Sequence, residues 1–243
     1  MCLAFLSFAP DEPWSVLLVS IRDEDLARPA AGAAEWWPDT HPGVLGGRDL
    51  RAGGTWLAVD PARRTVAAIF TPAVVEPTAP GQPSRGALPL RALSAGGLDE
   101  DQVRRYAPFA LLLAGPGGVG WWTWTGSSLD RVDVEPGMHI ANIDGLDAEA
   151  TSARQARWRK PFEVAAPVPF RPDGPPSRRW AGWLDLLGDG LEPEQPDALL
   201  LRRTVGDAAY GTKSVALVAL GQAGVRYDES SAPWDPGSWA TVC

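Results

Sequence analysis

Residues 2–21 read CLAFLSFAPDEPWSVLLVSI and contain two apolar runs, 2–8 and 14–21, on either side of the turn-forming cluster APDEP at 9–13. Two apolar runs around such a cluster predict a β-hairpin. Both runs are apolar at successive positions rather than at alternate ones, which is typical of strands covered on both faces. This stretch therefore predicts a sheet with a further layer of structure on each side.

The rest of the chain adds more hairpins and, later, a few helices. Antiparallel strands and amphipathic helices together predict an α+β fold, a four-layer αββα sandwich in which two antiparallel sheets stack and helices cover their outer faces. No linker separates two cores, so a single domain, 1–243, is expected. Segments rich in Gly or Pro are predicted to be loops or extended connections, at 28–54, 73–86 and 165–177. Strands are predicted at 55–59, 65–70, 109–114, 120–125, 129–134, 214–220, 225–228 and 238–242, and helices at 99–106, 146–159 and 177–187.

The charge balance excludes several classes of partner. The chain has 22 Lys and Arg against 30 Asp and Glu, a formal charge of −8. Such a chain is a poor candidate for binding nucleic acid or an anionic membrane surface. No apolar run is long enough for a transmembrane span, and the first 20 residues lack the basic start of a signal peptide, so a cytoplasmic protein is expected.

Cysteine and histidine are scarce. The two Cys stand at positions 2 and 243 and the two His at 41 and 139, and none of these residues has metal-ligand spacing. No metal or other cofactor is therefore expected. A Cys2–Cys243 disulfide is the less favoured alternative to two free thiols. His41 and His139 could ligate haem iron, and that reading is also the less favoured one.

Chemistry is expected at the N-terminus. Cys2 follows the initiator Met, and removal of Met1 would place a thiol and a free α-amine on one residue. An N-terminal Cys can use its own amine as general base, so this chemistry needs no His. The reference pKa of an α-amine, near 8, suits it to accept a proton near neutral pH.

The predicted hairpin brings two further residues to Cys2. If the turn centres near residue 12, residues whose numbers sum to about 24 face each other, so Cys2 lies opposite Arg22 and beside Asp23. A guanidinium favours the thiolate and lowers the pKa of the thiol, while a carboxylate could orient the amine. The structural alternative is that Cys2 is a plain core residue and that residues 22–25 form a solvated strand exit.

Short blocks along the chain resemble the NRDE family, also called the transport and Golgi organization protein 2 family. They occur in the order of that family: Met1-Cys2 before an apolar strand, Arg22-Asp23-Glu24, Gly53-Gly54-Thr55-Trp56-Leu57, Asn142 and Tyr210-Gly211-Thr212-Lys213-Ser214. The resemblance implies an N-terminal nucleophile hydrolase-like fold, which agrees with the predicted sandwich. It also implies kinship with penicillin V acylases, bile salt hydrolases and acid ceramidase-like amidases, which cleave linear amides through an N-terminal Cys.

The resemblance implies a role for each matching residue. Cys2 would be the nucleophile, Arg22 would hold the thiolate and the substrate, and Asn142 would serve as an oxyanion or amine-positioning side chain. Asp23 would position the amine, although the spacing in the amidases selects Asp25 instead. The implied substrate is a small-molecule amide, and the alternative function is non-catalytic binding or trafficking of haem or an acyl ligand. The sequence indicates no oligomeric state.

Three positions depart from the family pattern. Ile21 stands where the family has its first Asn, Thr71 stands where a second Asn follows the second hairpin, and Lys213 replaces the usual Arg. If the second Asn supplies an oxyanion donor, its loss would cost a few kcal/mol of transition-state stabilisation.

Overall fold

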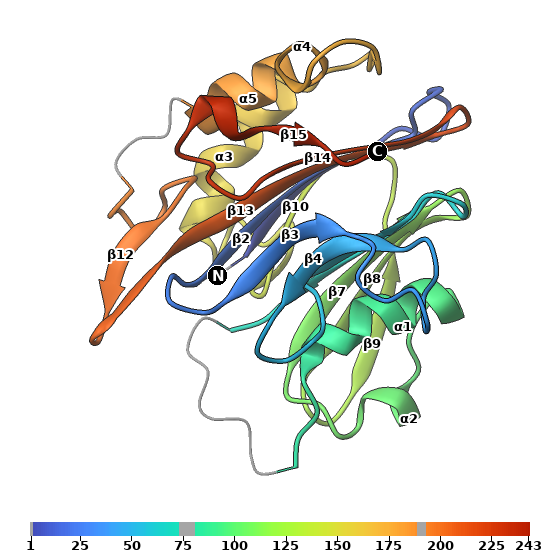
Figure 1. The fold of residues 1–243 in the computed structure, drawn as a ribbon, viewed down its shortest axis with the longest axis vertical. Coiled ribbons are helices and arrows are strands. Elements are labelled where there is room, and N and C mark those ends of the chain that lie inside the picture. Colours follow the sequence, from blue (N-terminus) through green and yellow to red (C-terminus); the bar gives the residue numbers. More distant parts are fainter. Residues whose placement is uncertain (1, 73–80, 189–192) are drawn as a thin grey trace. The chain divides into compact units, whose positions relative to one another are not determined.

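The computed structural model describes residues 2–72, 81–188 and 193–243, and in it the chain forms two antiparallel sheets with few helices (Figure 1). This is the α+β class that the sequence predicts. The described residues divide into two compact units. One unit combines Cys2–Ala27 with Pro136–Cys243, and the other is the intervening segment Arg28–Glu135.

The unit that contains both described ends of the chain has an eight-stranded sheet within the described residues. Its strand order is β11-β10-β1-β2-β13-β14-β15, and β12 pairs with β13 beside this path. Helices α3, α4 and α5 accompany this sheet (Figure 1). The strands are β1 (Leu3–Phe8), β2 (Val16–Asp25), β10 (Gly137–Asn142), β11 (Gly145–Leu146), β12 (Arg202–Val205), β13 (Ala208–Gly221), β14 (Gly224–Ser230) and β15 (Ala240–Thr241), and the helices are α3 (Ala153–Val164), α4 (Pro176–Arg179) and α5 (Ala181–Gly188).

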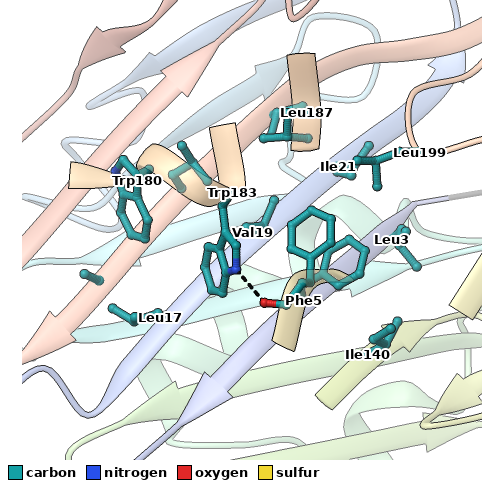
Figure 2. Close-up of a cluster of buried hydrophobic side chains, with 14 of the residues drawn as sticks. Leu3, Phe5, Leu17, Val19, Ile21, Ile140, Trp180, Trp183, Leu187 and Leu199 are labelled. Atoms are coloured by element: carbon teal, nitrogen blue, oxygen red, sulfur yellow. Dashed lines mark hydrogen bonds between the residues drawn. The ribbon is translucent and has the colours of Figure 1, made fainter. Parts of the chain in front are cut away.

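Aromatic side chains join the helices of this unit to its sheet. Figure 2 shows Trp180 and Trp183 of the helical segment in one cluster with Phe5 of β1 and Val19 of β2, on one face of the sheet. Trp183 donates a hydrogen bond from its indole N–H to the Phe162 carbonyl oxygen at 2.9 Å, and the Phe162 ring stacks on that of Phe5 at 3.5 Å. Each such ring, fully buried, stabilises the fold by roughly 1.5–3 kcal/mol, so this cluster fixes the helices to one face of the sheet.

The segment Arg28–Glu135 has a seven-stranded sheet within the described residues, in the order β3-β4-β5-β6-β7-β8-β9. Helix α1 packs on this sheet with Leu88 and Leu93, beside the indole of Trp122. The strands of this segment are β3 (Ala30–Ala34), β4 (Leu45–Asp49), β5 (Leu57–Asp60), β6 (Thr65–Phe70), β7 (Phe109–Gly115), β8 (Gly118–Trp124) and β9 (Leu129–Asp133). Its helices are η1 (Arg85–Ala87), α1 (Leu88–Ala95) and α2 (Glu100–Val103). The short helix η2 (Pro236–Ser238) belongs to the other unit.

The strand predictions hold better than the loop and helix predictions. The hairpins predicted at 2–21, 55–70 and 109–125 are present as β1–β2, β5–β6 and β7–β8. The loop predicted at 28–54 is wrong, because β3 and β4 lie within it. Gly46 and Gly47 of β4 were read as loop residues, but they allow close packing: a Cβ at Gly47 would lie 2.2 Å from the Trp56 ring.

The helices differ from prediction in length and position. The helix expected at 146–159 begins later, at Ala153, because β11 occupies the start of that range. The helix expected at 177–187 is two short helices that meet at Trp180, and the one at 99–106 is a single turn. Helix α1 was not predicted. Of the loop predicted at 73–86, residues 73–80 lie outside the described residues.

Candidate active site around Cys2

The hairpin register places Cys2 opposite Arg22. In β1 and β2, Leu3 pairs with Ile21 and Phe8 pairs with Val16, so paired residue numbers sum to 24 as predicted. Cys2 immediately precedes the first residue of β1. Continuing the same register by one residue puts it across from Arg22.

Side-chain alternation decides which neighbours share a face with Cys2. Leu3 and Ile21 both belong to the cluster packed against the helices. Because successive side chains of a strand point to opposite faces, Cys2 and Arg22 lie on the other face of the sheet. Asp23 falls on the helix-covered face, and Glu24 falls on the face of Cys2 and Arg22.

The Cys2 thiol is partly buried, and its Sγ lies 3.8 Å from the Asp23 carbonyl oxygen. Burial raises the pKa of this thiol above its usual value, and the negative charge of Asp23 raises it further. Arg22 acts in the expected direction and lowers it, but by less. Arg22 therefore lowers the pKa of the thiol as expected, but desolvation and the charge of Asp23 outweigh the guanidinium, so the net shift is upward.

Arg22 is buried, with 3% of its surface exposed. Its Nη2 lies 3.8 Å from Oε2 of Glu24, and Ser214 of β13 pairs with it across the sheet. A buried guanidinium is tolerated where a carboxylate balances its charge. Glu24 is thus the acidic side chain that accompanies Arg22 on the Cys2 face, and the sequence reasoning missed it.

The Asp23 carboxylate is held on the helix side. Its Oδ2 accepts a hydrogen bond from Arg154 of α3 at 2.5 Å, and its Oδ1 accepts one from the Thr212 hydroxyl at 2.7 Å. Arg154 also donates to the Leu199 carbonyl oxygen. Asp23 therefore meets Cys2 through its backbone carbonyl, and its side chain joins β2 to α3 and β13.

Asp25, the other predicted amine partner, also lies away from Cys2. Two positions after Asp23 it shares the helix-side face, and its Oδ1 accepts a hydrogen bond from the Ala27 backbone N–H at 2.8 Å. This contact closes the turn after β2, which is an ordinary use of an Asp side chain.

Asn142 ends β10, the strand that pairs with β1 on the side opposite to β2. Its side-chain amide donates to Ser152 at 2.9 Å and to Asp144 at 3.0 Å, and its carbonyl oxygen accepts from Gln155 and from the Asp144 backbone at 2.8 Å. Both amide hydrogens are thus engaged within the protein, so in this structure Asn142 braces the loop between β10 and α3.

The 210–214 block lies along β2, which explains why it accompanies residues 22–24 in the sequence pattern. Tyr210 donates from its hydroxyl to the Asp23 carbonyl oxygen at 3.0 Å, the same oxygen that Cys2 Sγ approaches. Burial, followed by the charge of Cys2, raises the pKa of Tyr210. Lys213 forms a bulge and donates to the Leu26 carbonyl oxygen at 2.9 Å.

Two departures from the family pattern have clear positions. Ile21 is fully buried in the helix-side cluster, so a polar Asn there would lose apolar packing. Thr71 follows β6, in the segment Arg28–Glu135.

The remaining Cys and His residues have ordinary partners. Both cysteines are free thiols, so no Cys2–Cys243 disulfide is formed. His139 Nδ1 lies 2.6 Å from Oδ2 of Asp147, and His41 Nδ1 lies 3.0 Å from the Thr40 hydroxyl. Within 2–72, 81–188 and 193–243, no group of three or more His, Cys, Asp or Glu could hold a metal ion. No helix in the same ranges has both the length and the apolarity to cross a bilayer.

Among solved structures, penicillin V acylase from Agrobacterium tumefaciens is similar at 12% sequence identity and a TM-score of 0.41, over 95% of this chain and 83% of that chain. No curated protein matches the chain. The model of the family described as Transport and Golgi organisation 2 matches residues 1–118, which include Cys2, Arg22, Asp23 and Glu24. Over residues 1–118 the chain is therefore similar to the Transport and Golgi organisation 2 family, which is the NRDE family.

Proposed function

We propose that this protein is an N-terminal cysteine hydrolase that cleaves a linear carbon–nitrogen bond of a small-molecule amide, with Cys2 as its nucleophile after removal of Met1. The observation that carries the proposal is the placement of the Cys2 thiol at the start of β1, opposite the buried Arg22 in the hairpin register. A buried cation beside a thiol has a use in catalysis, because negative charge forms near the sulfur during attack.

The raised pKa of the thiol makes the α-amine necessary. A thiol with a pKa above about 8.5 is at most a few per cent thiolate at pH 7. Proton transfer to an amine on the same residue supplies the nucleophile at the moment of attack. Arg22 would then stabilise the developing negative charge.

The proposed reaction conserves protons throughout. The Cys2 amine accepts the thiol proton as sulfur bonds to the amide carbonyl carbon. The tetrahedral intermediate collapses to a thioester when the ammonium returns that proton to the departing amine. Water then adds to the thioester, and the product is a carboxylic acid with the free thiol restored.

The structure argues for a positioning role for Asp23 rather than direct contact with the amine. Its carboxylate accepts hydrogen bonds from Arg154 and Thr212, and its carbonyl oxygen lies 3.8 Å from Cys2 Sγ. Glu24 is the carboxylate on the Cys2 face, beside Arg22. We assign Glu24 the amine-positioning role, and Asp23 the role of fixing the end of β2.

The first test is the intact mass of the purified protein. Quantitative retention of Met1 would exclude the free-amine mechanism. If Met1 is absent, turnover of a panel of N-acyl amides should be abolished in Cys2→Ala. Cys243→Ala is the matched control, because Cys243 is the other free thiol and belongs to the same unit. Equal turnover in Cys2→Ala and wild type would refute the proposal.

A further inference from the structure

A pocket lies at the edge of the sheet that carries Cys2. It has a volume of about 460 Å³ and is lined in part by residues of β12, the strand labelled in Figure 1. Neither Cys2 nor Arg22 lines it, so it is distinct from the proposed nucleophile site. The lining residues are Leu26, Glu194, Arg202, Arg203, Thr204 and Ala209.

Strand pairing places this pocket on the Cys2 face. Arg202 of β12 pairs with Gly211 of β13, and Gly211 pairs with Glu24 of β2. Directly paired residues of antiparallel strands point to the same face, so Arg202 shares the face of Glu24 and Cys2. Thr204, which is two residues further along β12, lies on that face as well.

The pocket is cationic in an acidic protein. In the described ranges, no carboxylate lies within ion-pair distance of the Arg202 or Arg203 guanidinium. Arg202 stands 5.5 Å over the Trp234 ring, which leaves its N–H groups available at the edge of the ring. Arg203 lies between Arg202 and Thr204 on β12, so by the same alternation its side chain belongs to the opposite face, where its Nε is buried without a hydrogen-bond partner in the described structure.

These features favour an anion as the occupant. A guanidinium presents a planar fork of N–H donors that matches the two oxygens of a carboxylate or phosphate. The Thr204 hydroxyl can add a neutral donor. Glu194, the acidic residue of the lining, makes no ion pair with either arginine in the described structure. Its negative charge would repel an anion, so an anion is expected to bind beside Arg202 and away from Glu194.

We propose that this pocket binds a terminal oxyanion of the substrate, a carboxylate or a phosphate, held by Arg202 with the Thr204 hydroxyl beside it. The proposal rests on the proposed function, because it names the class of amide that the Cys2 site would cleave. From β1 to β12 there are three strand spacings and a displacement of two residues, so the two sites are on the order of 16 Å apart at the backbone. The substrate is therefore an amide whose anionic group is remote from the scissile bond, rather than one with a carboxylate adjacent to it.

Binding is tested first, without turnover. Isothermal titration of the Cys2→Ser variant uses a medium-chain alkyl phosphate, the fatty acid of the same chain length and the corresponding alcohol. We expect the alkyl phosphate or the fatty acid to bind at least tenfold more tightly than the alcohol, and the tighter of the two identifies the anion. Arg202→Gln should remove this preference. Arg226→Gln is the matched control, since Arg226 also stands over an indole ring, that of Trp14, in the same unit.

Turnover separates this proposal from the proposed function. Amides that end in a remote carboxylate, a remote phosphate or a neutral group of equal length are compared in the native protein. KM for the anionic amides should rise at least tenfold in Arg202→Gln and partly recover in Arg202→Lys, with kcat nearly unchanged. Equal affinity for alcohol and anions, or equal losses in Arg202→Gln and Arg226→Gln, would overturn the proposal. Anion binding that depends on Arg202, with no hydrolysis of any amide, would refute the hydrolase and leave the anion site standing.

Discussion

Replacement of Arg154 by Ala tests how Asp23 is held beneath the Cys2 site. Arg154 Nη1 lies 2.5 Å from Asp23 Oδ2, and the side chains are 8% and 0% exposed. The substitution removes the guanidinium from a buried carboxylate that also accepts a hydrogen bond from the Thr212 hydroxyl, and it removes the donor to the Leu199 carbonyl oxygen. Asp23 would then lose a charged hydrogen-bond partner in the interior.

The magnitude follows from that burial. Removing one partner of a buried ion pair costs about 3–5 kcal/mol, because the remaining charge is desolvated without compensation. Arg157, on the same helix, provides the comparison: its ion pair with Asp197 at 3.0 Å involves side chains 43% and 33% exposed. An exposed pair contributes only about 0–1 kcal/mol.

The assay is urea denaturation of wild type, Arg154→Ala and Arg157→Ala, with the free energy of unfolding taken by linear extrapolation. We expect Arg154→Ala to lose several kcal/mol and Arg157→Ala to lose less than about 1 kcal/mol. The double variant Arg154→Met with Asp23→Leu should be more stable than Arg154→Ala, because it leaves no buried charge. A loss below about 1 kcal/mol in Arg154→Ala, or a double variant less stable than the single one, would refute this account of Asp23.

Three other substitutions probe the site and its surroundings. Glu24→Gln removes the carboxylate beside Arg22, so alkylation of Cys2 by iodoacetamide at pH 7 should accelerate by roughly 2- to 10-fold. Gly211→Ala places a Cβ 2.4 Å from a backbone oxygen across the sheet edge, and should lower the free energy of unfolding by about 1–3 kcal/mol. Asp147→Asn removes a carboxylate whose pKa lies below its usual value. Burial alone would raise that pKa, but hydrogen bonds, first of all the one with His139, lower it by more. That carboxylate stabilises the fold above a pH of about 4 and loses this effect as the pH falls further, so the variant should be less stable at pH 7 and lose less stability in acid.

The first two of these substitutions each have a control variant. Asp25→Asn changes a carboxylate on the helix-side face, and should leave the alkylation rate unchanged. Gly117→Ala adds a Cβ that meets nothing within 4 Å, and should be nearly neutral. Equal alkylation of wild type and Glu24→Gln, equal stability of the two Gly variants, or an unchanged acid transition in Asp147→Asn would contradict the corresponding interpretation.

The parts of the fold that depend on local sequence could be predicted. The β1–β2 hairpin and its register follow from two apolar runs and one turn cluster within 20 residues, and the observed pairing of Leu3 with Ile21 agrees. Strands β3 and β4 could not be predicted in this way. The sequence Ala-Ala-Gly-Ala-Ala of β3 has low strand propensity, and the glycines of β4 are needed for close packing against Trp56. Tertiary contacts, rather than local propensity, make this segment extended.

In the candidate site, too, contacts between residues close in the sequence could be predicted, whereas contacts between distant residues could not. Cys2 and Arg22 come together through a hairpin, so spacing alone predicts their proximity. Arg154 lies 131 residues after Asp23, and no local pattern connects them. Thr212 and Tyr210 were quoted only as members of a block, and their contacts with Asp23 depend on the pairing of β13 with β2. The thiol pKa could not be predicted either, because its direction depends on how deeply the thiol is buried.

The acidic residues of β2 differ in the face of the sheet to which their side chains belong. Spacing along the chain does not distinguish Asp23 from Asp25, because two positions apart they point to the same face of β2. The contact of Asp23 with Arg154 identifies that face as the helix side, and Ile21, two positions earlier, packs there too. By this alternation both Asp side chains belong to the helix-side face, although the charge of Asp23 still raises the pKa of the Cys2 thiol, whereas Glu24 between them lies on the face of Arg22. On the Cys2 face of β2, Glu24 is the acidic residue beside Arg22, and we therefore assign the amine-positioning role to it.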